Sequence, residues 1–249
     1  GIVTTPVQSL ADIATSVAVQ PDGKIVVAGS SESPGYDFAV VRYNADGSLD
    51  LSFDGDGKVT TPVLSLDDKA YSVLIQPDGK IVAIGTAITS GPTHDIAAVR
   101  YNSNGSLDNS FSGDGKVTVP VSPSDDQART GALQPDGKIL AAGNYFAGPN
   151  GGFSLVRFNA DGTLDPAFDG DGIVTTPVPG SVGAALSMAL QPDGRIVTAG
   201  SATNGSTSDF TLLRYNGDGS IDTTFDGDGK ITTPLGWSSE ANGVAIQPD

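Results

Sequence analysis

The side chains best suited to binding or chemistry are polar and aromatic residues that interrupt an otherwise repeating pattern. They are Glu32, Tyr36, His94, Arg129, Tyr145, Trp237 and Glu240. His94, the only histidine, is the one candidate base, but no serine elbow motif accompanies it, and an ordinary exposed loop residue is the simpler interpretation. Tyr145 and Trp237 offer faces on which sugar rings stack, although half-buried loop aromatics are commoner. We assign no catalytic residue, and we predict a ligand site that includes Tyr36, His94, Arg129, Tyr145 and Trp237.

Carboxylates form a second group of candidates. Asp46, Asp50, Asp54 and Asp56 are spaced through a glycine-rich loop, and oxygen ligands in such loops are what calcium uses. The match to known calcium loops is incomplete, because their first acidic ligand falls on Arg42, a cation. Calcium is therefore one interpretation of this loop, and turn-forming aspartates with an ion pair between Arg42 and Asp50 are the other.

Three further aspartates share one repeated position, eight residues before a recurring glutamine: Asp12, Asp68 and Asp126. Glycine and serine replace them in the last two copies. If the repeats surround an axis, these carboxylates could coordinate a cation or a ligand at the mouth of the central channel. Solvated aspartates that begin a strand are the more ordinary interpretation. Calcium is the only cofactor that the sequence suggests.

The composition excludes several function classes. The formal net charge is −16, and 11 of the 13 Lys and Arg residues occupy positions that recur in every repeat, so no basic patch is left for nucleic acid. The chain has no cysteine, which excludes disulfides, thiolate metal sites and a cysteine nucleophile. No apolar run approaches the roughly 20 residues of a membrane helix, and we expect no membrane insertion. The acidic surface suits an extracellular or cell-surface protein.

One unit of about 57 residues accounts for the whole chain of 249 residues. Its glutamine recurs, with spacings of 56, 58, 57 and 56 residues, at Gln20, Gln76, Gln134, Gln191 and Gln247. A period of this length is typical of repeat architectures. The repeats lie at approximately residues 1–56, 57–114, 115–171 and 172–228, with a partial copy at 229–249, and together they form one predicted domain.

Each unit predicts four short strands, called A to D, which in the first copy are residues 16–20, 24–29, 37–43 and 58–63. They are rich in β-branched and aromatic residues and are separated by Gly, Pro and Asp turns. The QPDG segment between A and B predicts a tight turn in which Gly23 adopts a left-handed backbone. Strand D carries a proline in every copy. Since proline cannot donate to the ladder, D should be an outer edge strand.

Four-stranded antiparallel units that cannot each bury their own faces predict an all-β fold, a β-propeller. A linear solenoid is the alternative, but 57 residues is long for one coil. Four full A-to-D sets are flanked by a lone D strand at residues 1–7 and a lone A strand near 243–249. We hypothesise that the missing B and C strands come from the rest of a longer chain or from a neighbouring subunit.

The motifs QPDGKI, RYNxxGSLD and FxGDGKVTT recur over essentially the whole chain, and with them the sequence resembles the delta-60 repeat family of bacterial proteins. The resemblance implies a β-propeller in a large exported protein, often in many tandem copies. It implies no catalytic residues. Departures are small: Phe158 replaces the usual tyrosine, Arg195 the usual lysine, and Ser112 the first aspartate of DGDG.

The two ends of the predicted blades differ in sequence character. The A–B and C–D connections are nearly identical in all repeats, whereas the B–C and D–A connections differ from copy to copy. Recognition is expected at variable loops on a constant scaffold. We predict a non-catalytic structural or binding scaffold of a secreted or cell-surface bacterial protein, whose partners are other domains, neighbouring subunits, a carbohydrate or a protein. An extracellular propeller enzyme, a hydrolase or lyase acting on carbohydrate, is the alternative, but spacing alone does not identify its opposed carboxylates.

Overall fold

A computed structural model of the chain describes residues 1–8, 10–90, 93–147, 150–178, 183–204 and 207–247. These residues form sixteen strands in four sheets of four strands each. The same residues contain no helix that is long and apolar enough to cross a membrane. The chain divides into two compact units, residues 1–119 and 120–249, with two sheets in each.

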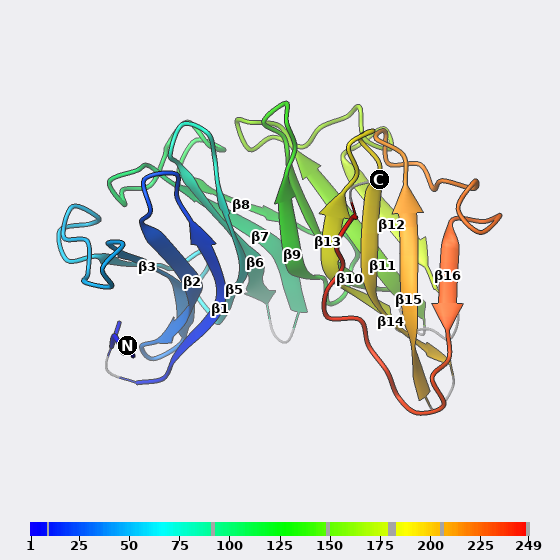
Figure 1. Cartoon of the computed structure of the whole chain (residues 1–249), viewed down its shortest axis with the longest axis horizontal. Coiled ribbons are helices and arrows are strands. Elements are labelled where there is room, and N and C mark those ends of the chain that lie inside the picture. Colours follow the sequence, from blue (N-terminus) through cyan, green and yellow to red (C-terminus); the bar gives the residue numbers. More distant parts are fainter. Residues whose placement is uncertain (9, 91–92, 148–149, 179–182, 205–206, 248–249) are drawn as a thin grey trace. The chain divides into compact units, whose positions relative to one another are not determined.

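Each sheet is an antiparallel meander in which the strand order follows the chain (Figure 1). Blade 1 contains β1 (Asp12–Val19), β2 (Ile25–Glu32), β3 (Tyr36–Tyr43) and β4 (Lys58–Thr61). Blade 2 contains β5 (Asp68–Ile75), β6 (Ile81–Ser90), β7 (Thr93–Tyr101) and β8 (Lys116–Val119). Blade 3 contains β9 (Gln127–Leu133), β10 (Ile139–Ala147), β11 (Asn150–Phe158) and β12 (Ile173–Pro177). Blade 4 contains β13 (Gly183–Leu190), β14 (Ile196–Asn204), β15 (Thr207–Tyr215) and β16 (Lys230–Thr233).

The predicted fold, a β-propeller of four-stranded antiparallel blades, is confirmed. Each blade holds the four strands A to D of one repeat, and strand D lies at an edge, as its proline requires. In blade 1, Pro62 directly follows β4. Strand D also ends directly before its proline in blades 2 and 4, where pairing stops because the donor is lost, and it is shorter there than predicted; in blade 3 it includes Pro177.

The turns between strands A and B form as predicted. In blade 1 the Gly23 amide donates to the Gln20 carbonyl (2.9 Å) and the Gln20 amide to the Lys24 carbonyl (2.8 Å). Gly23 has a φ of 85°, a left-handed conformation that strains any residue with a side chain. The same turn hydrogen bonds recur in the other three blades, and this turn fixes the register between strands A and B.

Strand A approaches strand B closely at a second glycine. β5 contains a β-bulge between Ala70 and Ser72, and a Cβ atom at Gly85 of β6 would lie 1.9 Å from the Lys69 carbonyl oxygen. The same overlap recurs in blade 1, where a Cβ at Gly29 would lie 1.8 Å from the Ile13 oxygen. Glycine is required here by the close backbone approach and not by its φ angle.

The core of the first unit lies between blades 1 and 2. Blade 1 contributes Val26, Ala28, Phe38, Val40 and Phe53, and blade 2 contributes Ala70, Val73, Ile81, Ala83, Ala97, Val99 and Tyr101. All are buried, so one face of each sheet is covered by the other blade. Blades 3 and 4 share a core of the same kind in the second unit.

The two terminal segments are not strands, contrary to prediction, yet each occupies a strand position. Thr5 Oγ1 accepts a hydrogen bond from Tyr43 Oη (2.8 Å), as Thr61 of β4 does from Tyr101 (2.8 Å). Residues 1–7 therefore lie against blade 1 as β4 lies against blade 2. At the other end, the Val244 amide donates to Ser187 Oγ (3.2 Å). This repeats the contact of β5 with blade 1, so residues near 244 take the place of a following strand A.

Candidate functional site

The C–D loops hold an ion-pair framework. Arg42 Nε donates to Asp50 Oδ2 (2.7 Å), and Lys24 Nζ lies 3.2 Å from the same oxygen. The Arg42 guanidinium also stacks over Phe53, 4.7 Å from the ring centre, and donates to the Ser103 carbonyl of blade 2. Burial tends to raise the pKa of Asp50, but Ser52, Lys24 and Arg42 outweigh it and hold that pKa well below its usual range. The predicted ion pair is confirmed.

The ion pair recurs in all four blades. The guanidinium-to-carboxylate distance is 2.7 Å for Arg100 and Asp108, Arg157 and Asp165, and Arg214 and Asp222. In each unit the first of these arginines also reaches the next blade, Arg42 donating to the Ser103 carbonyl and Arg157 to the Gly217 carbonyl.

The other carboxylates proposed as calcium ligands close separate turns. Asp46 accepts bonds from the amide and the hydroxyl of Ser48 (2.9 and 2.6 Å), and Asp56 accepts the Lys58 amide (2.9 Å). Asp54 adopts a left-handed backbone with a φ of 50°. Among the described residues, no group of three or more Asp, Glu or His side chains is arranged to hold a metal ion.

Asp12, Asp68 and Asp126 cap the connection between strands D and A. Asp68 Oδ2 accepts the Val63 and Leu64 amides (2.8 and 2.9 Å), and Asp12 Oδ2 accepts the Val7 amide (2.9 Å). Burial raises the pKa of Asp68 and of Asp126. For Asp12 burial also acts upward, but hydrogen bonds from Ser31 and the Val7 amide outweigh it and lower the pKa. These carboxylates lie at the start of strand A, as the simpler interpretation expected, but Asp68 and Asp126 are fully buried and not solvated, and each serves its own loop.

Tyr36 belongs to a polar cluster at the end of the blades that carries the variable loops. Its ring lies under Lys69 Nζ at 4.6 Å, and its amide donates to Asp67 Oδ1 (3.1 Å). The carboxylate of Glu32 raises the pKa of the Tyr36 hydroxyl. The B–C hairpin of blade 1 is thereby joined to the D–A loop of blade 2. Lys69 was missed as a site residue, although it is one of only two cations outside the repeat pattern.

The other predicted ligand residues lie on separate elements. His94 is half-buried in β7, opposite Ile88, and not in an exposed loop as predicted. Tyr145 lies in β10 and is only 9% exposed, so its ring is not available for stacking. Arg129 lies in β9 and donates to Gln127. Trp237 follows β16 and is 84% exposed.

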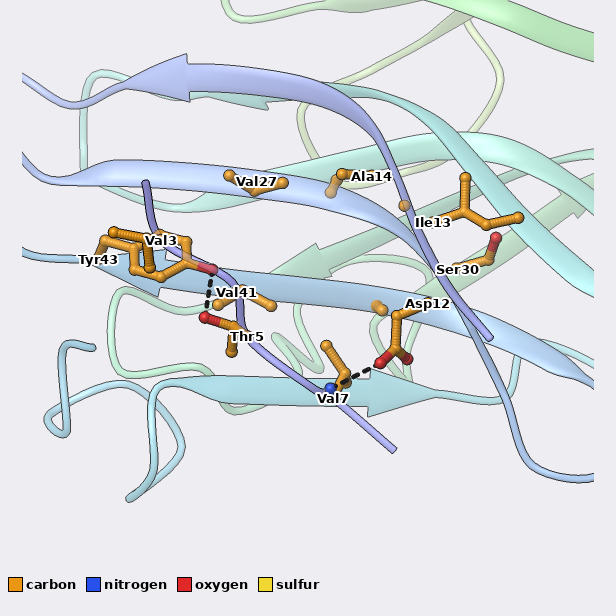
Figure 2. A pocket seen from close by; sticks show the side chains of 13 residues that line it. Val3, Thr5, Val7, Asp12, Ile13, Ala14, Val27, Ser30, Val41 and Tyr43 are labelled. Atoms are coloured by element: carbon orange, nitrogen blue, oxygen red, sulfur yellow. Dashed lines mark hydrogen bonds between the residues drawn. The ribbon is translucent and has the colours of Figure 1, made fainter. Parts of the chain in front are cut away.

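A cavity of about 200 Å³ lies between residues 1–7 and the sheet of blade 1. Figure 2 shows Val3, Thr5 and Val7 along one side of it, with Val27, Val41 and Tyr43 on the strands opposite. Hydrogen bonds from Tyr43 to Thr5, from the Val7 amide to Asp12 and from Lys58 Nζ to the Pro6 carbonyl hold the segment in place. The lining is mostly aliphatic and offers no pair of carboxylates for hydrolysis.

A second cavity of the first unit, about 460 Å³, lies between the A–B turns of blades 1 and 2. Gln20 and Gln76 line it, and the Oε1 atom of each is buried without a hydrogen-bond partner. A buried amide oxygen left unpaired costs about 1–3 kcal/mol.

A family model described as a domain of unknown function (DUF5122) beta-propeller matches four segments: residues 20–53, 76–111, 134–168 and 191–225. Together they make up more than half of the chain. Each segment runs from the glutamine of QPDG to the phenylalanine of FxGDG, so the matches follow the repeat. No match was found among curated proteins.

Solved structures share the fold at low identity. The chain is similar to a protein of unknown function from Dyadobacter fermentans DSM 18053, at 14% identity and a TM-score of 0.52, over 88% of this chain and 64% of that one. A putative glycoside hydrolase from Parabacteroides distasonis ATCC 8503 matches at 12% identity and a TM-score of 0.47, over 88% and 72%. A GH43_12 protein from a capybara gut metagenome matches at 11% and 0.45, over 88% and 40%. The chain thus spans less than two thirds of the first of these, and the likeness concerns the fold alone.

Proposed function

We propose that this chain, which belongs to the DUF5122 beta-propeller family, is a non-catalytic binding scaffold of a secreted or cell-surface bacterial protein. Its ligand is a carbohydrate polymer, bound through the B–C and D–A loops. Its net charge of −16 favours a neutral or cationic ligand over an anionic one.

The separation of constant and variable residues carries the proposal. In every blade the recurring arginine of strand C forms an ion pair with the recurring aspartate of the C–D loop. The residues that break the repeat include Tyr36, Lys69 and Trp237, which lie in or beside the B–C and D–A loops. Loops held by a rigid framework are where binding residues concentrate.

Trp237 supports a carbohydrate as the ligand. Its indole is 84% exposed, on a D–A segment whose Ser239 amide donates to the Ser208 carbonyl of β15 (2.6 Å). An exposed aromatic on a segment with this anchor offers a flat apolar face of the kind that sugar rings stack on.

The test is an array of bacterial and plant polysaccharides probed with the labelled chain. We expect binding that Trp237→Ala weakens at least about tenfold, because the stacking surface is lost. Leu51→Ala is the matched control, since Leu51 is a similarly exposed apolar residue (66%) in a C–D loop. Binding that depends on Leu51 and not on Trp237 would contradict the proposed face.

The enzyme alternative is tested with the same ligands. Release of new reducing ends or unsaturated sugars, abolished by His94→Ala or Glu240→Gln, would replace the scaffold by a hydrolase or lyase. A scaffold releases neither product at any protein concentration.

Calcium has no part in this proposal, because Asp46, Asp50 and Asp56 already accept hydrogen bonds from their own loops. We expect that adding or chelating calcium leaves the melting temperature unchanged. A rise with calcium that Asp50→Asn abolishes would restore the calcium site.

A further inference from the structure

Blade 1 presents to solvent a sheet face that blade 2 buries. Blade 2 covers its face with blade 1, so that Val73 is 5% exposed and Tyr101 and Ala83 are fully buried. The equivalent positions in blade 1 are Val17 and Tyr43, together with Val27. Val17 is 63% exposed, and the other two are partly exposed and line the cavity of Figure 2. The repeat positions that form a buried interface in blade 2 are therefore exposed or partly exposed in blade 1.

One strand of the missing neighbour is already present. Residues 1–7 read GIVTTPV, identical to residues 172–178, which contain strand D of blade 3. They also make the contacts of a strand D. Lys58 Nζ lies 3.2 Å from the Pro6 carbonyl oxygen, as Lys116 Nζ lies 3.1 Å from that of Pro62. Ile2 and Val3 are nevertheless 93% and 58% exposed, because no strand C lies beside them.

We propose that the open face of blade 1, together with residues 1–7, binds strands A, B and C of one further repeat of this type, which lies outside residues 1–249. Strand C of the incoming repeat pairs with residues 1–7, and its B and C strands cover Val17, Val27 and Tyr43. The result is a complete blade whose strand D belongs to this chain. This surface is distinct from the variable loops. The inference therefore goes beyond the binding function proposed above and does not depend on it.

The contacts between blades 1 and 2 specify what the occupant must look like. Blade 1 covers blade 2 with aliphatic and aromatic residues from strands B and C, namely Val26, Ala28, Phe38 and Val40. An occupant needs the same pattern, alternating along two neighbouring strands at the sheet spacing. A repeat that carries QPDGKIVVAG and DFAVVRY meets this requirement, whereas an unrelated peptide supplies at most one of the two strands.

The register of the new pair follows from blade 3. There Leu155 pairs with Val174, Ser154 with Thr175 and Phe153 with Thr176. Because residues 1–7 repeat this sequence, an incoming strand of the same type places its equivalents of these residues opposite Val3, Thr4 and Thr5.

The test places a second copy of residues 120–171 directly before Gly1 of the full chain. This copy contains strands A to C of blade 3 and lacks strand D. We expect the melting temperature to rise by roughly 5 °C or more, since the exposed aliphatic side chains become buried. Val17→Asp should abolish this rise in the extended chain while changing the melting temperature of the original chain little.

A cross-link tests the register directly. The chain has no cysteine, so Thr4→Cys paired with Ser154→Cys in the added copy is the only disulfide that can form. We expect it to close under mild oxidation, and Thr4→Cys paired with Asp161→Cys in the copy, on a turn outside the paired strands, to stay reduced.

Three outcomes would overturn the inference. The first is no rise in melting temperature and no cross-link, with the added copy cleaved rapidly by protease. The second is a rise that Val17→Asp does not affect, which would place the copy elsewhere. The third is self-association of the original chain, seen by sedimentation and abolished by Val17→Asp, which would make a second copy of this chain the occupant.

Discussion

Blades 1 and 2 carry nearly the same side chains on the same strands, yet their environments differ. Val17 and Val73 are the same residue at the same repeat position, but Val17 is 63% exposed and Val73 is 5% exposed. Asp12 and Asp68 cap the same turn, but the pKa of Asp12 is lowered and that of Asp68 is raised. In a repeat protein, burial is therefore a property of the neighbouring blade as much as of the residue itself.

The strongest test of this comparison is Gly85→Ala against Gly29→Ala. Both added methyl groups overlap a strand A carbonyl. However, β5 packs against blade 1, whose Thr15 Oγ1 donates to the Ala70 carbonyl (2.7 Å), whereas no other blade packs against β1 among the described residues of the first unit. We expect Gly85→Ala to lower the free energy of unfolding by about 3 kcal/mol or more and Gly29→Ala by about 1–2 kcal/mol. Urea unfolding measures both, and equal losses would mean that the open face gives β1 no freedom to move.

Truncation of the equivalent valines, Val73 and Val17, should give the next-largest difference in the free energy of unfolding between blades 2 and 1. Val73→Ala removes two methyl groups from the core, and we expect a loss of about 2 kcal/mol. Val17→Ala, at an exposed position, should change the free energy of unfolding by no more than about 0.5 kcal/mol. Thermal melts of the two variants give the comparison. A large effect at Val17 would show that its face is already covered in solution.

The two interblade tyrosines offer a smaller contrast. Tyr101 donates to Thr61 in a fully buried site, and burial raises the pKa of its hydroxyl. We expect Tyr101→Phe to cost about 1–2 kcal/mol, because Thr61 loses its partner. Tyr43→Phe leaves a partly exposed Thr5 that water can reach, and it should cost about 0.5 kcal/mol or less. Denaturant midpoints distinguish these values, and the reverse order would refute the assignment of residues 1–7 to a strand D position.

The smallest expected effect concerns acid. A carboxyl whose pKa is lowered on folding, such as Asp12, adds stability above its ordinary value near 3.8 and loses it as the pH falls through the folded value. Asp68, whose pKa is raised, does the opposite and favours the folded state as the pH falls toward 3.8. Between pH 6 and 3, Asp12→Asn should therefore flatten the loss of stability with acid, and Asp68→Asn should steepen it. The measurement is the free energy of unfolding of each variant across this range. If both substitutions change the slope against pH in the same direction relative to the original chain, the difference between the caps is contradicted.

Sequence reasoning predicted the blade and its turns because their signals are local. QPDG specifies its turn through proline and glycine geometry, and the proline of strand D specifies an edge. Strand A was predicted four residues too short at its start. The bulge between Ala14 and Ser16 breaks the alternation that marks a strand, and the capping role of Asp12 depends on a contact with Val7.

The candidate site was harder to predict. Tyr145 and His94 lie beside glycine- and proline-containing segments in the sequence, but the B–C hairpins extend far enough to include both in strands. The sequence indicated that the lone strand D at residues 1–7 lacks neighbouring strands. It did not indicate which residues of blade 1 are exposed, because these have the same types as the buried residues of blade 2. The two cases differ only in what lies beside them, and a local pattern carries no such information.

The strand order described above also bears on how the protein forms during synthesis. Every strand pairs only with strands adjacent in the chain, and Thr15 reaches no further than Ala70 to touch the next blade. The contact order is therefore low for an all-β protein, and hairpins can close without waiting for distant segments. Within each unit, the second blade can cover the first as soon as its strands leave the ribosome.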